Sequence, residues 1–182
     1  MNYIQTYVER DVRLIKNITD LNAFQTFTQL CAGRIGQLLN LSALAHDCGI
    51  SHNTARSWLS VLEASFVIFL LKTHHKNFNK RLVKMPKLYF YDVGLAAALL
   101  GIENVDQVDT HPLRGNLFEA MMVSELVKYR YHQGLPPQCY FWRDKTGHDI
   151  DCLLDAHNEL IPIEIKSGET ISEHYFDELR YW

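Results

Sequence analysis

Apolar residues recur along the chain with two different periods, and together these periods predict a mixed α/β fold. Steps of three and four residues are typical of helices that bury one face. They predict helices over 3–32, 93–100 and 115–132 and the start of a helix over 172–182. Short apolar runs rich in β-branched and aromatic residues, bounded by turn residues, predict strands. These runs cover 66–71, 87–92, 139–142, 150–154 and 160–166, and residues 102–112 are expected to be a polar connection.

Residues 38–63 carry the pattern of a helix-turn-helix. Ser42 and Ser51 are predicted N-caps of two short helices, with Gly49 in the turn between them. Two predicted strands joined by a basic loop follow directly, which is the element order of a winged helix. In a DNA-binding winged helix the second helix enters the major groove, so His52, Asn53 and Arg56 are candidates for base contacts. A helical segment that contacts protein has the same pattern, and this alternative stays open.

Positive charge is concentrated in one window of the chain. Residues 72–87 hold six Lys or Arg and no acid, which leaves −9 (−3 minus 6) on the rest of the chain. Such asymmetry favours a surface that binds anions, and the phosphates of a nucleic acid are the natural partner. The alternative is an ordinary solvated loop. The candidate contacts are Lys76, Lys80, Arg81 and Lys84.

Composition narrows the class of protein. Hydrophobic residues make up 47% and charged residues 21% of the chain, which is typical of globular domains. No apolar run reaches the roughly 18 residues of a membrane helix, and the charged N-terminus does not have the apolar core of a signal peptide. The four cysteines form no CxxC pair and are expected to be reduced thiols. We therefore expect a cytoplasmic protein without a membrane partner.

Four ionisable residues fall at places where chemistry is expected. Glu119 lies on the apolar face of the predicted helix 115–132, and a buried carboxylate needs a cation or a donor. Asp151 lies in an apolar strand. Glu164 and Lys166 are two residues apart, so in a strand they share one face. Three carboxylates and a lysine suit Mg²⁺ or Mn²⁺, with Lys166 orienting a water nucleophile. A solvated Glu164–Lys166 ion pair is the simpler alternative.

The arrangement Asp151, Glu164 and Lys166, with Glu119 on the preceding helix, resembles the PD-(D/E)XK restriction-endonuclease-like superfamily. Ile150 stands where the proline of that pattern usually lies. Over nearly the whole chain, the sequence is similar to an uncharacterised domain found C-terminal to the ATPase module of prokaryotic AAA-type ATPases. The strings that carry this resemblance include YVERDV (7–12), GQLLNLSALAHDCGIS (36–51), RGNLFEAMMVSEL (114–126), FWRDKTGHDIDCLL (141–154) and IPIEIKSG (161–168).

The resemblance implies a winged-helix-like domain over 35–92 followed by a nuclease-like α/β domain over 93–182. The helical pattern adds a lead-in over 1–34, and because the predicted helix over 172–182 is cut short, we expect the second domain to be truncated at its C-terminus. Glu119, Asp151, Glu164 and Lys166 would be catalytic, and the three carboxylates would hold the metal. The chain has no G-x-x-x-x-G-K-[ST] loop, so we expect no ATP binding. The expected partners are nucleic acid, an ATPase module or a second copy of the chain. The alternative is a catalytically inactive regulatory or protein-interaction module.

Overall fold

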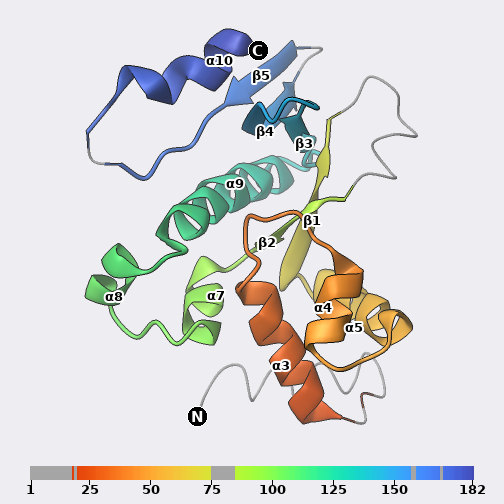
Figure 1. Cartoon of the computed structure of the whole chain (residues 1–182). Coiled ribbons are helices and arrows are strands. Elements are labelled where there is room, and N and C mark those ends of the chain that lie inside the picture. Colours follow the sequence, from red (N-terminus) through yellow and green to blue (C-terminus); the bar gives the residue numbers. More distant parts are fainter. Residues whose placement is uncertain (1–17, 19, 75–84, 157–158, 169) are drawn as a thin grey trace.

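The computed structural model describes residues 18, 20–74, 85–156, 159–168 and 170–182. It confirms the mixed α/β class, with helices leading into a five-stranded mixed sheet of order β2-β1-β3-β4-β5. Figure 1 shows α3, α4 and α5 gathered at one end of the molecule and β5 and α10 at the other, with α9 between them.

The described N-terminal helices are α3 (Leu21–Ala32), α4 (Leu41–Asp47) and α5 (His52–Ala64). Most of the helix predicted over 3–32 lies outside the described residues. The described part begins only at Leu21, because the Asp20 side chain accepts a hydrogen bond from the Ala23 backbone N–H and caps the helix.

The helix-turn-helix segment forms, with one correction to its caps. Ser51 caps α5 as predicted, accepting a hydrogen bond from the Thr54 backbone N–H at 3.0 Å. The predicted cap Ser42 is wrong, because Asn40 accepts from the Ala43 backbone N–H and starts α4 two residues earlier. Gly49, at φ +69°, makes the turn between the helices.

All five predicted strands form, with different bounds. They are β1 (Ile68–Thr73), β2 (Lys87–Phe90), β3 (Cys139–Arg143), β4 (Asp149–Ala156) and β5 (Glu159–Ile163). Strand β1 pairs antiparallel with β2 and parallel with β3, so the predicted wing strands belong to the same sheet as β3–β5. Because β5 ends at Ile163, the expectation that Glu164 and Lys166 share a strand face is wrong.

The other helices of the described residues are α7 (Val93–Leu99), α8 (Val105–Thr110), α9 (Arg114–His132), η2 (Glu173–Phe176) and α10 (Asp177–Tyr181). Helices α7 and α9 match their predictions within one residue. Residues 102–112 were expected to be a polar connection, but part of this segment forms helix α8. The helix begins with a capping box, in which the Asn104 and Gln107 side chains each accept a hydrogen bond from the other's backbone N–H.

One cluster of buried side chains runs from Ile18 to Cys152 and joins the helices to the sheet. At the helical end, Trp58 of α5 packs edge-to-face on Phe24 and Phe27 of α3, with ring centroids 5.3 and 5.6 Å apart. Strand β2 is buried along its whole length. Among the described residues, the helices are all too short or too polar to span a membrane.

Candidate functional site

A buried charge cluster lies where β2, α9 and β4 meet. The Lys87 amine of β2 donates to Glu119 Oε1 of α9 at 3.0 Å and lies 3.8 Å from Asp151 Oδ1 of β4. The Tyr89 hydroxyl donates to the same Glu119 oxygen. The side chains of Lys87, Glu119 and Asp151 are only 10%, 15% and 12% exposed, so each is paired away from bulk water.

The local sequence explains why these side chains converge. Lys87 and Tyr89 are two residues apart on β2, so both project from one strand face toward α9. Asp151 follows the fully buried Ile150 on β4. Its Oδ2 accepts a hydrogen bond from the Ile165 backbone N–H at 2.9 Å. This bond fixes the segment 164–166 against β4 just after β5 ends.

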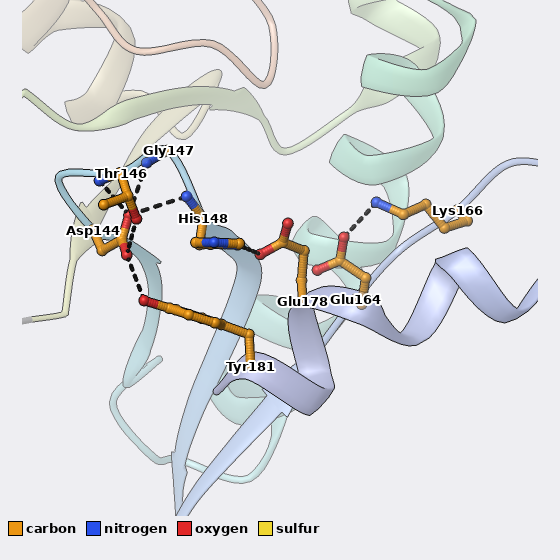
Figure 2. A network of polar contacts seen from close by, with 8 residues as sticks. All are labelled: Asp144, Thr146, Gly147, His148, Glu164, Lys166, Glu178 and Tyr181. Carbon is orange, nitrogen blue, oxygen red and sulfur yellow. Dashed lines mark hydrogen bonds and ion pairs between the residues drawn. The ribbon is translucent and has the colours of Figure 1, made fainter.

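Glu164 and Lys166 form an ion pair with each other, as Figure 2 shows. The Glu164 side chain is 5% exposed and the Lys166 side chain 41%. Glu164 Oε2 is buried and has no hydrogen-bond partner within the part of the chain that the structure describes. A buried carboxylate oxygen without a donor is costly, so it marks a place where a ligand would be stabilised.

The protonation of the cluster follows from burial. Burial raises the pKa of the Glu119 carboxyl, the neighbouring Lys87 ammonium opposes this rise, and the Asp151 carboxylate adds to it. Burial likewise raises the pKa of the Glu164 carboxyl against the opposing hydrogen bond from Lys166. For Lys166, burial disfavours the charged amine, but the surrounding carboxylates, Glu164 first, outweigh it and raise the pKa.

The arrangement does not fit a metal ion held by all three carboxylates. Within the described ranges, no group of three or more His, Cys, Asp or Glu side chains is placed to hold a metal. Glu119 Oε1 is taken by Lys87 and Tyr89, and Asp151 Oδ2 by the Ile165 N–H. Glu164 alone keeps a buried oxygen without a partner among the described residues. Because Lys87 is already the cation of Glu119 and Asp151, we derive no metal-dependent step from this geometry.

Lys87 and Tyr89 were missed by the sequence reasoning. Lys87 was counted in the basic window, although it is buried in a strand. The sequence feature that indicates a buried Lys87 is its place at the start of the apolar run KLYFYD. If that strand is buried, its lysine needs an acidic partner.

The candidate nucleic-acid contacts lie on another element. His52, Asn53 and Arg56 are all exposed in the first turns of α5, just after the Ser51 cap. The candidates of the basic window, Lys76, Lys80, Arg81 and Lys84, lie outside the described residues. Among the described candidates, the exposed polar side chains thus gather on the first two turns of α5, with Arg56 as their one fixed positive charge.

A second polar network holds the C-terminal helix (Figure 2). His148 Nδ1 and Glu178 Oε2 are 3.0 Å apart, and the Tyr181 hydroxyl donates to Asp144 Oδ2 at 3.1 Å. The Asp144 carboxylate also accepts hydrogen bonds from the backbone N–H groups of Thr146 and Gly147. These contacts hold α10 against the turn between β3 and β4.

The protein has a mixed α/β fold with a buried polar cluster of four residues, Lys87, Tyr89, Glu119 and Asp151. The chain belongs to the family described as Domain of unknown function (DUF8612), whose sequence model matches residues 1–106. Residues 114–182 match a second family, Domain of unknown function (DUF4143). Lys87 and Tyr89 lie in the first matched segment, whereas Glu119 and Asp151 lie in the second. Because its residues come from both matched segments, we call this group the composite cluster.

The chain is also similar to an uncharacterized protein of Mycobacterium tuberculosis and an uncharacterized protein of Mycobacterium bovis. Each is 29% identical over 171 residues, which cover 93% of this chain and 38% of the relative. The chain thus spans well under half the length of these relatives. No solved structure matches it significantly.

Proposed function

We propose that this chain is a nucleic-acid-binding region of an AAA-type ATPase and has no ATPase activity of its own. Two observations support the ATPase context. The family matched by residues 114–182 is commonly associated with AAA-type ATPases, and the mycobacterial relatives are much longer than this chain. Since the sequence has no phosphate-binding loop, ATP hydrolysis would belong to another part of such a protein.

The exposed N-terminal turns of α5 carry the proposal of nucleic-acid binding. His52, Asn53 and Arg56 offer hydrogen-bond donors on a helix whose start is fixed by Ser51 and whose buried face packs through Trp58. A rigid helix with an exposed N-terminal donor set suits the contact of a recognition helix with bases and phosphates. The strands β1 and β2 follow this helix in the order that a winged helix requires.

We further propose that the region is not catalytic in the described arrangement. Two of the three carboxylates that the resemblance would give to a metal, Glu119 and Asp151, instead share the Lys87 ammonium. In this proposal the nuclease-like segment serves as a scaffold or as a regulatory surface for the ATPase.

Salt-dependent binding of labelled duplex and single-stranded DNA tests the proposal by fluorescence anisotropy. Affinity should fall steeply with salt, because bound phosphates release counterions. Arg56→Ala should weaken binding and reduce the salt slope by about 1, the share of one phosphate contact. Lys128→Ala removes the same charge from an exposed pair with Glu125 on α9 and should leave binding unchanged. Equal affinities of Arg56→Ala and wild type at every salt concentration would contradict DNA binding by α5.

A metal-dependent phosphodiesterase is the second candidate function, favoured by the buried Glu164 Oε2, which has no hydrogen-bond partner among the described residues. Isothermal titration with Mn²⁺ compares the wild type with the Asp151→Ala, Glu164→Ala double variant. Binding by the wild type alone, followed by Mn²⁺-dependent cleavage of linear or single-stranded DNA, would support this function. Binding by neither protein leaves the non-catalytic proposal.

A further inference from the structure

We infer that Lys87 is the resident cation of the composite acidic cluster and that it takes the place of a divalent metal ion between Glu119 and Asp151. This inference concerns the cluster alone and is independent of DNA binding by α5. Lys87 is then a positioning residue that pairs with both carboxylates and prevents a metal ion from binding to them.

The Lys87 amine lies close to both Glu119 and Asp151. The Lys87 Nζ is 3.0 Å from Glu119 Oε1 and 3.8 Å from Asp151 Oδ1, so a single ammonium pairs with one oxygen of each carboxylate. Mg²⁺ demands oxygen ligands at about 2.0–2.1 Å in near-octahedral order and keeps several waters. Such a shell needs the space that the Lys87 amine fills.

Neighbouring side chains hold the Lys87 amine in place from more than one side. The Tyr89 hydroxyl shares Glu119 Oε1 with Lys87, which fixes that carboxylate on β2. On its apolar side, the Lys87 amine lies 5.7 Å from the centroid of the Phe141 ring of β3, within range of a cation–π contact. The amine therefore contacts α9, β3 and β4 while its backbone stays in β2.

The Lys87 ammonium is the positive charge that the Glu119 and Asp151 carboxylates share. Removing the lysine charge would leave two nearly buried carboxylates without their cation, and such groups strongly favour a replacement cation or a proton. A divalent ion could then pair with the Glu119 and Asp151 carboxylates in place of the Lys87 ammonium. Lys87 and a divalent ion are thus competitors for one set of oxygens.

Mn²⁺ binding to Lys87→Met tests the inference, because methionine keeps similar volume without charge. We expect saturable binding by isothermal titration and a rise in Tm with Mn²⁺ for Lys87→Met, since a ligand that binds the folded state stabilises it. The wild type and the matched control Lys128→Met should show neither effect. Adding Asp151→Asn to Lys87→Met should reduce the Mn²⁺ affinity at least tenfold.

Each other outcome decides the question as well. Mn²⁺ binding by the wild type, lost in Asp151→Ala, overturns the inference, as does a folded Lys87→Met that binds no Mn²⁺. If Lys87→Met is unfolded without metal, circular dichroism is repeated in Mn²⁺. Recovery of the wild-type spectrum supports the inference, whereas a chain that stays unfolded shows that metal does not replace the lysine and overturns it. DNA affinity of the wild type is measured separately and is unaffected by these outcomes.

Discussion

The imidazole of His148 and the phenol of Tyr181 stack with their ring centroids 3.8 Å apart and their planes inclined by 16°. His148 precedes β4, whereas Tyr181 ends α10, so the stack joins the β3–β4 turn to the C-terminal helix. Trp142 of β3 lies beside the same helix end, with its ring centroid 5.0 Å from that of Trp182. Helix α10 is therefore held mainly by rings and by the hydrogen bonds of Figure 2.

Tyr181→Ala should lower the free energy of unfolding by about 1 kcal/mol, because it removes the stack on His148 and the hydrogen bond to Asp144. Tyr181→Phe keeps the ring and should lose less. Urea denaturation followed by far-ultraviolet circular dichroism measures both. Tyr129→Ala is the control at a similarly exposed tyrosine of α9. A loss for Tyr129→Ala as large as that for Tyr181→Ala would argue against a specific role of the stack.

Asp144→Asn should change the acid sensitivity of the fold. Hydrogen bonds lower the pKa of the Asp144 carboxyl to about 2, the Thr146 hydroxyl contributing most and the Tyr181 hydroxyl less. The unfolded value is about 3.9. The carboxylate therefore adds stability above its unfolded pKa, and this stability is lost as the pH falls through about 2.

Urea midpoints measured between roughly pH 5 and pH 2 check this expectation. The wild type should lose more stability than Asp144→Asn over that window. Asp106→Asn, at an exposed aspartate of α8, is the control. Parallel curves for the wild type and Asp144→Asn would rule out the proposed stabilisation of the ionised carboxyl.

Glu164→Gln should have the opposite effect on the pH profile. Burial raises the pKa of the Glu164 carboxyl, so the folded state keeps a proton that the unfolded chain releases near the ordinary value of about 4.3. Stability of the wild type should therefore fall, relative to the variant, as the pH rises from that value through the raised pKa. The comparison is made by urea denaturation at several pH values, with the exposed Glu159→Gln as control. A pH dependence shared by all three proteins would refute a raised Glu164 pKa.

Ser51→Ala should cost about 1 kcal/mol of stability, because it removes the side-chain acceptor of the Thr54 N–H at the start of α5. Chemical denaturation measures the loss. Ser60→Ala is a matched control in the same helix, since the Ser60 hydroxyl only donates back to the Arg56 carbonyl. If the two alanine variants are equally stable, the cap contributes nothing beyond an ordinary helical serine.

Local patterns predicted most of the helices and strands. The Ser51 cap and the bounds of α9 could be recognised because both signals lie within one or two helical turns, whereas the predicted apolar face around Glu119 is wrong at Met122, which is exposed. Helix α8 was missed because the segment around Val105 has few apolar residues, and its stability comes from the Asn104–Gln107 capping box.

The composite cluster could be predicted only in part. The sequence indicates that Glu119 and Asp151 need partners, because both carboxylates lie among apolar residues, and in the structure both pair with Lys87. The partner itself could not be identified, because the pairing of Lys87 with Glu119 depends on how β2 lies against α9 across 32 residues of chain. Glu164 and Lys166 were expected on one strand face, but β5 ends before them, and strand ends depend on pairing that a single sequence does not reveal.

The parallel pairing of β1 with β3 has a consequence for dissecting this protein. Lys72 and Thr73 pair with Tyr140 and Phe141, and the His74 backbone N–H donates to the Phe141 carbonyl at 2.6 Å. A fragment holding residues 114–182 alone would leave this side of β3 as an open edge, with backbone donors and acceptors free to recruit a strand from another chain. Self-association of such a fragment would then report the missing neighbour strand and would say nothing about the quaternary structure of the longer protein.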